Sequence, residues 1–379
     1  MMRYKLGEIF NLQMGKTPDR HSPKFWNEGT EPWISIADLT KCNKYIENTA
    51  EKITATAVDG SGIKIIPKNT VIMSFKLSIG KVAITPKEMY SNEAIMSFID
   101  KGVLKIEPVY LYYLLMHKDW DTGTNKAVMG KTLNKASLSQ MTVNIHGYSE
   151  QLEIIKALDA ASSIIAARKQ QLAELDKLIK SRFVELFGDC KSMVPMNELC
   201  SIITDGTHQP PRFQESGIPF IFVSNLVGNV VTYNAEKFIS EDTYAELYKR
   251  TPIEIGDLLL STVGSYGHPA VVTEDRKFLF QRHIAYLKPR HNMVNSFYLH
   301  SALLAPDGQR QIEEKVKGIA QKTLNLSEIK KIVVPLPTIE EQNQFEKFVN
   351  QIDKSKVAVQ KALDEAQTLF DSLMQKYFG

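Results

Sequence analysis

Two segments of equal length, 150–188 and 341–379, place apolar residues along one helical face at intervals of seven. In the first segment the repeating positions are Leu158, Ile165, Leu172, Ile179 and Leu186. In the second segment the apolar positions of the same pattern are Val349, Ile352, Val359, Leu363 and Phe370. Apolar a and d positions of a heptad form the seam of a coiled coil, so the pattern predicts two long helices that pack on each other. The alternative is that each helix packs only on its own globular unit.

Three long charged residues interrupt the predicted seam, namely Arg168, Arg182 and Lys356. Such side chains either pair across a seam or extend outward to water. Each helix is preceded by a short β-rich run and by a candidate cap, Ser149 or Thr338, with an acidic residue and a glutamine in the first turn. This arrangement is typical of a helix start.

The segments before the helices, 1–149 and 189–340, indicate mixed α/β units. Each contains a predicted strand that ends in serine, within 66–74 and 255–261, followed by a polar loop. The loops lead to Gly80 and Gly267 and then to another apolar strand. Later in each unit the sequence predicts one helix, over 109–117 and over 296–304.

Short motifs recur at a constant shift of 191 residues. Lys-Thr-Leu-Asn occurs at 131–134 and 322–325, Glu-Gln at 150–151 and 341–342, and Phe-Gly at 187–188 and 378–379. A repeat of this length indicates a duplicated domain rather than a solenoid unit. We therefore predict four segments: a first recognition unit at 1–149, a helical spacer at 150–188, a second recognition unit at 189–340 and a second helical spacer at 341–379. Two similar binding units suit a bipartite ligand, and double-stranded DNA is the prime candidate.

Composition narrows the class of protein without defining its function. The chain has 379 residues and 43% hydrophobic content, enough for more than one domain. No apolar run reaches the length of a membrane span and no signal peptide is expected, so we predict no membrane partner. Three cysteines without a Cys-x-x-Cys pair argue against a disulfide framework and favour the reducing cytoplasm.

Charge separates the two units. Residues 1–149 carry 19 Lys and Arg against 14 Asp and Glu, whereas residues 189–340 carry 16 against 17. Only the first unit is basic, so DNA binding by the second unit rests on its similarity to the first rather than on charge.

Polar loops on a rigid scaffold commonly carry binding residues, and both units offer basic and amide side chains there. The residues of the first unit that we predict to contact DNA are Lys16, Thr17, Arg20, Lys76, Ser78, Lys81, Lys126 and Lys131. The corresponding residues of the second unit are Thr207, His208, Gln209, Arg212, Ser265, Tyr266, His268 and Lys322, with Lys317 in the place of Lys126. Each residue taken singly fits ordinary surface charge better, but the paired clusters favour DNA contact.

Catalytic motifs are weak. The chain has no P-loop and no GxGxxG, and 209–212 lacks both the acid or amide before the prolines and the aromatic after them that a DNA amino-methylase requires. Asp307 with Glu328 and Lys330 formally matches a nuclease pattern that the first unit does not repeat. The histidines show no metal-binding spacing. We therefore expect no catalytic residue, no metal site and no cofactor in this chain.

Several of these features together resemble the specificity subunits of type I restriction–modification systems. They are Gly15–Pro18 with Trp26 and Trp33-Ile34, the strand-loop-glycine units at 66–80 and 255–267, and the twice-occurring Lys-Thr-Leu-Asn that leads to Glu-Gln and a long helix. The resemblance covers essentially the whole length. It implies two target-recognition domains of mixed α/β fold, arranged pseudo-symmetrically and joined by two helices that form an antiparallel coiled coil. Each recognition domain would read one half of a split DNA sequence, and the coiled coil would set the gap.

The resemblance also implies partners. Two methylation subunits would bind each specificity subunit, and endonuclease-translocase subunits would join for cleavage. S-adenosylmethionine, ATP and Mg²⁺ would then belong to these partners. The second unit departs from the usual first loop at His208, Pro210 and Pro211. Two alternatives stay open: an enzyme that combines DNA recognition with its own nuclease site, and a scaffold whose coiled coil joins two protein-binding domains.

Overall fold

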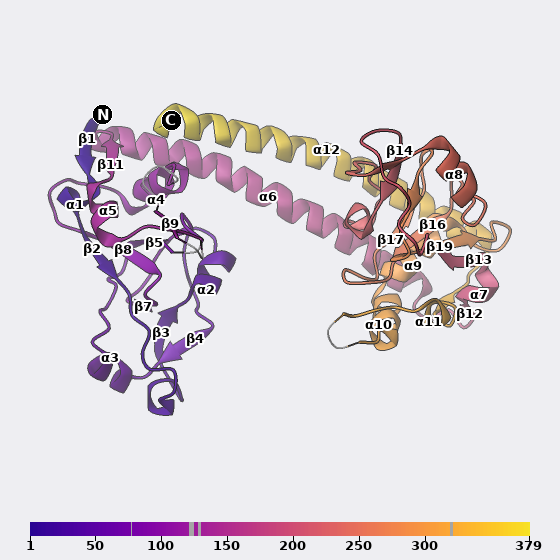
Figure 1. Cartoon of the computed structure of the whole chain (residues 1–379), viewed down its shortest axis with the longest axis horizontal. Coiled ribbons are helices and arrows are strands. Elements are labelled where there is room, and N and C mark those ends of the chain that lie inside the picture. Colours follow the sequence, from indigo (N-terminus) through magenta and orange to yellow (C-terminus); the bar gives the residue numbers. More distant parts are fainter. Residues whose placement is uncertain (77, 121–124, 128–129, 319–320) are drawn as a thin grey trace. The chain divides into compact units, whose positions relative to one another are not determined.

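The computed structural model describes residues 1–76, 78–120, 125–127, 130–318 and 321–379, with the backbone alone for 125–127 and 130–132. Contacts divide the chain into two compact units, Met1–Ala167 with Ala362–Gly379, and Arg168–Lys361 (Figure 1). Each unit thus combines one globular part with half of each long helix. The division into four segments treats the helices as separate spacers and stays a prediction.

The first unit is built around two small sheets. Its elements up to the first long helix are β1 (Met2–Lys5), α1 (Leu6–Ile9), β2 (Phe10–Met14), η1 (Pro23–Phe25), β3 (Glu31–Ile34), α2 (Ile36–Lys41), β4 (Glu51–Ile53), α3 (Ala55–Ser61), β5 (Val71–Ser74), β6 (Val82–Ile84), β7 (Tyr90–Ser91), β8 (Ile95–Asp100), α4 (Pro108–His117), β9 (Asn125–Ala127), β10 (Gly130–Thr132), α5 (Lys135–Gln140) and β11 (Thr142–Ile145). β2, β8, β5 and β6 form an antiparallel sheet in that order, and β4, β3 and β7 form a second sheet in which β3 and β7 are parallel. β1 pairs with β11, so the start of the unit is joined to its end.

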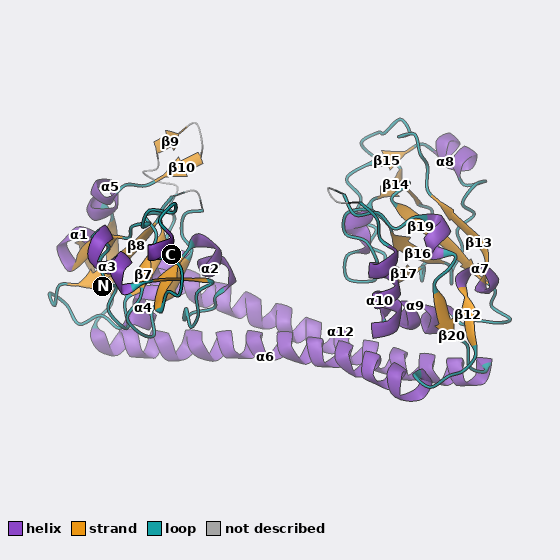
Figure 2. Ribbon diagram, turned by 90° about the horizontal axis from the view of Figure 1, so that it is seen from below, coloured by secondary structure: helices purple, strands orange, loops and turns teal. Residues whose placement is uncertain are grey.

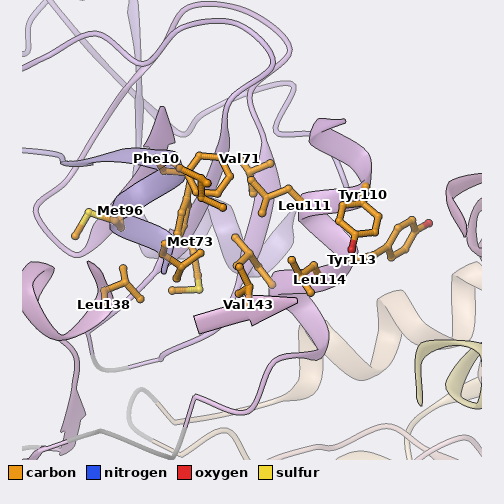
Figure 3. Packing of buried hydrophobic residues seen from close by; sticks show 14 of the residues in the cluster. Phe10, Val71, Met73, Met96, Tyr110, Leu111, Tyr113, Leu114, Leu138 and Val143 are labelled. Atoms are coloured by element: carbon orange, nitrogen blue, oxygen red, sulfur yellow. The ribbon is translucent and has the colours of Figure 1, made fainter. Parts of the chain in front are cut away.

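Successive residues of β5 point to opposite faces of the sheet, and both faces are buried. Val71 and Met73 join the larger core, whereas Ile72 between them joins a smaller one. Helix α4 covers the larger core with Tyr110, Leu111 and Leu114, and Figure 3 shows these side chains in one cluster with Val71, Met73 and Phe10. Burial on both faces explains why these strands are apolar runs rather than alternating ones.

The second unit repeats this architecture. Its elements are β12 (Met193–Pro195), α7 (Met196–Leu199), β13 (Cys200–Asp205), β14 (Ile218–Ile221), η2 (Val223–Leu226), β15 (Phe238–Ile239), α8 (Glu241–Leu247), β16 (Leu258–Ser261), β17 (Pro269–Val271), β18 (Leu279–Phe280), β19 (Ile284–Pro289), α9 (Ser296–Leu304), α10 (Pro306–Lys315), α11 (Leu326–Ile329) and β20 (Val333–Pro335). The sheet orders are β13-β19-β16-β17 and β15-β14-β18, and β12 pairs with β20. Each matches its counterpart in the first unit strand for strand, so the predicted duplication is confirmed at the level of topology.

The predicted strands and helices of both units are present. β5 and β16 end at Ser74 and Ser261, and α4 and α9 occupy Pro108–His117 and Ser296–Leu304. Figure 2 shows α9 between the larger sheet of the second unit and the long helices, where Tyr298 packs against Phe183 with ring centroids 5.4 Å apart. The helix after the larger sheet therefore seats the long helices on each globular part.

The two long helices are α6 (Tyr148–Phe187) and α12 (Ile339–Phe378). They begin differently. Thr338 caps α12 as expected, because its backbone N–H donates to Glu341 at 2.9 Å and its hydroxyl accepts from the Glu341 N–H at 3.3 Å. The expected cap Ser149 is wrong: α6 starts at Tyr148, two residues before the predicted start at Glu150, and the Gly147 N–H donates to Glu150 at 2.9 Å. In α6 the acidic residue alone satisfies the first backbone donor.

Within the second unit the two helices run antiparallel. Asp176 of α6 binds Lys356 of α12 at 2.7 Å, and the rings of Phe187 of α6 and Phe345 of α12 meet edge to face with centroids 5.6 Å apart. Eleven residues forward on α6 thus correspond to eleven residues backward on α12. Lys356, one of the charged exceptions, pairs across the interface rather than extending to water.

The heptad pattern is wrong at its end. Leu186 is 46% exposed, whereas Phe183 and Phe187 are buried. A straight α-helix drifts by about 20° per heptad, so four heptads after Leu158 the predicted position has rotated roughly 80° out of the interface. The end positions also contact the globular cores, since Leu158 belongs to the first core and Val349 to the second. The alternative of helices packed on their own units is therefore correct in part.

Candidate nucleic-acid interface

Three loops of the first unit meet at one end of its larger sheet. β2 and β5 both run antiparallel to β8, so they end where β8 begins. Loop 15–20 and the described residues 75–76 and 78–81 leave the sheet at that end, and loop 92–94 enters it there. We call these residues the first loop edge. Loops 206–212, 262–268 and 281–283 occupy the same positions in the second unit and form the second loop edge.

Matching backbone hydrogen bonds hold the two loop edges. Gly15 N–H donates to Ile95 O at 3.1 Å, and Gly206 N–H donates to Ile284 O at 3.2 Å. A Cβ atom at Gly15 would lie 2.3 Å from backbone oxygens of loop 91–92, and one at Gly206 would lie 2.2 Å from Phe280 O. Only glycine allows two backbone segments to approach this closely.

The repeated Lys-Thr-Leu-Asn motif is joined to the same edges. Leu133 N–H donates to Phe75 O at 3.1 Å, and Leu324 N–H donates to Thr262 O at 2.8 Å. Both leucines are buried, and Asn134 caps α5 through Ser137. The leucine of each motif therefore has a structural role, and so does Asn134 in the first motif.

The Glu-Gln motif is also structural. The buried Gln151 side chain accepts from Glu107 N–H at 3.0 Å and donates to the carbonyls of Lys105 and His146 at 3.2 and 3.0 Å. Gln342 repeats these contacts with Asn295 N–H at 2.8 Å and the carbonyls of Met293 and Pro337 at 3.2 and 3.0 Å. We call each set of three bonds a glutamine clamp. Sequence reasoning found the motif but not this function.

At the first loop edge, predicted contact residues surround a carboxylate. Thr17 donates its hydroxyl hydrogen bond to Glu93, which is exposed. This bond lowers the pKa of the Glu93 carboxyl, and the charges of Lys76 and Arg20 lower that pKa further. Glu93 therefore stays ionised at neutral pH. The Lys16 ammonium group meanwhile donates to Ser61 O.

Arg20 is held with its guanidinium over two aromatic rings. Its guanidinium lies 3.9 Å from the Trp26 ring centroid and 4.7 Å from that of Trp33, and it donates to Glu51 at 3.1 Å. Stacking fixes the plane of the guanidinium while leaving almost half of the side chain exposed. A guanidinium so oriented can still approach a phosphate.

The other predicted residues of the first unit lie on the β5–β6 connection or beyond it. Lys76 lies over the Phe75 ring at 5.3 Å, Ser78 is exposed, and Lys81 donates to Thr40 at 2.5 Å. The side chains of Lys126 and Lys131 lie outside the described residues. Their backbones face each other in the β9–β10 hairpin.

At the second loop edge the predicted residues are mostly paired with one another or with acids. His208 and Arg250 both contact Asp205, at 2.9 and 2.6 Å. Thr207 donates to Gln209 O at 2.9 Å, and Gln209 and Arg212 are exposed. The predicted cluster therefore exists, but with acidic neighbours that reduce its net charge.

The β16–β17 loop carries a second network. Ser265 contacts His268 at 3.1 Å, and the other ring nitrogen of His268 contacts Asn229 at 3.1 Å. Lys322 binds Glu313 at 2.9 Å and the Tyr266 hydroxyl at 3.3 Å, while Lys317 lies 3.5 Å from Glu328. These side chains are ordered by one another before any ligand binds.

Sequence reasoning missed Arg282 and His283, which lie between β18 and β19. A cavity of about 280 Å³ opens here, lined by these two residues together with Asp205, Thr262, Gln321 and Asn325, among others. Burial lowers the pKa of His283, and the Arg282 charge lowers it further. The missed signal was positional: loop 281–283 aligns without a gap with loop 92–94.

The residues of the nuclease pattern have local partners. Asp307 pairs with Arg310, and Glu328 pairs with Lys331 at 3.2 Å. Among the described residues, no three or more His, Cys, Asp or Glu side chains are grouped so as to hold a metal ion. Within the same parts of the chain, no helix combines the length and apolar character needed to cross a membrane.

The chain is similar in sequence to known proteins. The chain is 29% identical over 243 residues to the specificity subunit of the type I restriction enzyme EcoBI from Escherichia coli, covering 60% of this chain and about half (51%) of that protein. It is 25% identical over 397 residues to the MjaIX specificity subunit of Methanocaldococcus jannaschii, covering 96% of this chain and 90% of that protein.

A solved structure shares the fold. The type I restriction–modification S subunit from M. genitalium aligns over 100% of this chain and 96% of its own, with a TM-score of 0.52 and 15% identity. A family model described as the type I restriction modification DNA specificity domain matches residues 1–177 and 193–366. Because this match takes in most of both units, the chain belongs to the family of type I restriction–modification DNA specificity domains.

Proposed function

We propose that this chain is the DNA-recognition subunit of a type I restriction–modification complex, in which each loop edge reads one half of a bipartite duplex sequence. The observation that carries the proposal is the repeated scaffold with two differently equipped loop edges. Equal backbones suit two similar stretches of DNA groove, and unlike side chains suit two unlike half-sites.

The predicted contact residues divide between phosphate and base. Arg20, Lys76, Lys81, Arg212 and Lys322 supply positive charge for phosphates, and the ordered polar groups of Ser265, Tyr266 and His268 suit base edges. We include Lys131 because it begins the Lys-Thr-Leu-Asn motif, and Lys126 because its backbone faces that of Lys131 in the β9–β10 hairpin. The acidic neighbours of the second loop edge make its phosphate contacts fewer and its salt dependence weaker.

The long helices complete the proposal as a spacer. Their antiparallel packing within the second unit supports this role. The spacer sets the distance between half-sites and offers surfaces to two methylation subunits, which endonuclease-translocase subunits join for cleavage. The chain itself is non-catalytic, and the complex acts on cytoplasmic DNA. S-adenosylmethionine, ATP and Mg²⁺ serve the partner subunits.

Exchange of one recognition unit tests the division of labour. Residues 1–149 are replaced by those of a related specificity subunit, and the chimera is expressed with the methylation subunits of the proposed complex. Methylome sequencing should show a new first half-site and an unchanged second one. A change in both halves would contradict independent reading of the two half-sites. If the wild-type complex neither bound DNA nor methylated a specific sequence, the proposed function would be wrong.

Lengthening the helices tests the spacer. One heptad inserted after Leu172 and a matched one after Leu363 keep the interface in register and add about 10 Å, close to three base pairs. The unread gap should lengthen by about three base pairs while both half-sites persist. A three-residue insertion in one helix alone is the control and should weaken assembly. An unchanged gap with full activity would refute the helices as a ruler.

A further inference from the structure

The β7–β8 loop 92–94 and the β18–β19 loop 281–283 are one backbone feature with opposite charge. Both have three residues, and Glu93 occupies the position that Arg282 occupies in the other unit. Ile95 N–H donates to Asn92 O at 3.3 Å, and Ile284 N–H donates to Gln281 O at 3.1 Å. The first residue of each loop also donates to the smaller sheet, to Ile34 O at 3.0 Å and Ile221 O at 3.4 Å.

Each loop lies at the centre of its loop edge. Phe75 N–H donates to Ala94 O at 3.0 Å, and Thr262 N–H donates to His283 O at 2.9 Å. From the other side, Lys16 N–H donates to Ser91 O at 2.8 Å, and Thr207 N–H donates to Phe280 O at 3.3 Å. The middle residue therefore projects from a rigid backbone, between the two loops that were predicted to bind DNA.

A carboxylate at this position conflicts with phosphate binding. Glu93 is exposed near the charges of Lys76 and Arg20, where it would repel a phosphate and lower the affinity for DNA. It is nevertheless held in place by the Thr17 hydroxyl, which leaves lone pairs of both carboxylate oxygens as acceptors. In the major groove the donors that a carboxylate can accept from are exocyclic amino groups, above all N4 of cytosine.

Arg282 presents the opposite chemistry. Its Nε–H donates to His283 at 3.3 Å, and among the described residues its two terminal NH₂ groups have no hydrogen-bond partner. Arg282 lines the cavity that Thr262 and Asn325 also line. Two parallel N–H groups match the O6 and N7 acceptors of guanine.

We propose that Glu93 and Arg282 are the equivalent base-reading residues of the two units, Glu93 accepting a hydrogen bond from the N4 amino group of a cytosine and Arg282 donating two to a guanine. This inference rests on the proposed function and deepens it. One position of each half-site is thereby assigned to one side chain, and the difference between the two half-sites is assigned in part to a single charge reversal.

Glu93→Gln, Arg282→Gln and Arg282→Lys test the proposal in the complete complex with its methylation subunits. The wild-type methylome first gives the target, and duplexes with every base at each position are then titrated against each complex. Matched controls are Glu88→Gln and Arg276→Gln. They remove the same charges from exposed positions in the loops after β6 and β17, at the end of each larger sheet that lies away from the loop edge.

The expected result is position-specific. Glu93→Gln should lower discrimination roughly 5- to 150-fold at one C·G pair of the first half-site, and Arg282→Gln should do so at one G·C pair of the second. Relaxation at an A·T pair would overturn the cytosine assignment, because the only major-groove amino group of that pair is N6 of adenine. Arg282→Lys should retain the salt dependence of binding but lose much of the discrimination, because an ammonium lacks the fork of two donors.

Two outcomes would overturn the proposal. In the first, Glu93→Gln tightens binding to all sequences alike and Arg282→Gln weakens binding to all alike, which identifies effects on phosphate attraction alone. In the second, all three variants and both controls leave the motif unchanged although the wild type reads a bipartite target. A wild type that selects no sequence would instead refute the proposed function, so the two failures are distinguishable.

Discussion

The two recognition units share almost every backbone contact and almost no side chain at their loop edges. Both have the same sheet orders, the same close approach at Gly15 and Gly206, and the same glutamine clamp. At the loop edges, however, the side chains differ. Glu93 lies near the charges of Lys76 and Arg20 in the first unit, whereas Arg282 lines a cavity with His283 and Asp205 in the second. Backbone hydrogen bonds thus hold the loops in place, so side chains at their tips can vary without cost to the fold.

Each unit holds one cation over a pair of aromatic rings, with different residues in the two units. In the first unit Arg20 stacks on Trp26 and Trp33. In the second unit Lys237 lies 4.7 Å from the Phe213 ring centroid and 5.6 Å from that of Phe222. Both pairs place a cation over rings beside the smaller sheet, but an ammonium cannot donate in a planar fork as a guanidinium does.

The largest expected effect tests whether the shared contacts are equally important in the two units. Gln151→Met and Gln342→Met each leave one buried N–H and two carbonyls without a partner, at about 1–3 kcal/mol per group. Each should lower the free energy of unfolding of its own unit by roughly 3 kcal/mol or more. Urea unfolding measures the loss, and hydrogen exchange locates it.

Gln209→Met, at an exposed position of the second loop edge, is the control for the glutamine clamps and should unfold like the wild type. A large loss for one clamp and a negligible one for the other would break the equivalence of the two units. It would show that only one long helix depends on its clamp.

A smaller effect should distinguish the two cores. Asp257 is fully buried next to Tyr286, where the first unit has Thr70 at the matching strand position, and burial raises the pKa of Asp257. Since the folded pKa lies above the unfolded one, this group contributes stability that is complete below the unfolded pKa and is lost as pH rises through the folded pKa.

Asp257→Asn should therefore stabilise the second unit at neutral pH and match the wild type below the unfolded pKa. Unfolding midpoints measured across this pH range give the comparison, with the exposed Asp275→Asn as control. Asparagine that destabilises the unit at neutral pH would mean that the ion pair with Lys288, 3.5 Å away, outweighs the cost of burial.

The smallest expected effect on stability concerns the exposed pair of Lys322 and Glu313. Lys322→Ala should leave the unfolding midpoint unchanged, because exposed ion pairs contribute little. It should nevertheless lower the slope of log affinity against log salt by about one unit if Lys322 binds a phosphate. Equal slopes for variant and wild type would remove Lys322 from the interface. Lys330→Ala, at an exposed position in the turn that ends α11, is the control.

Much of the fold follows from local pattern. Apolar runs bounded by turns predicted β5 and β16, and the repeated motifs predicted that the two units would share one topology. Where prediction failed, a geometric detail was decisive: helical drift exposes Leu186, and a glutamate rather than Ser149 satisfies the first donor of α6. Neither error could be avoided from periodicity alone, since a heptad fixes spacing but not the rotation of a straight helix.

The sequence by itself determined the duplication, the mixed α/β units, the two long helices and the family, because these depend on residue spacing and on motifs that repeat along the chain. Tertiary structure decided which residues share a surface. Glu93 and Arg282 lie in short loops that contain no binding motif, and only strand direction and pairing bring them between loops that are distant in sequence. Likewise, only folding shows that Gln151 and Gln342 satisfy buried backbone groups, since the partners of a polar side chain depend on what the fold removes from water.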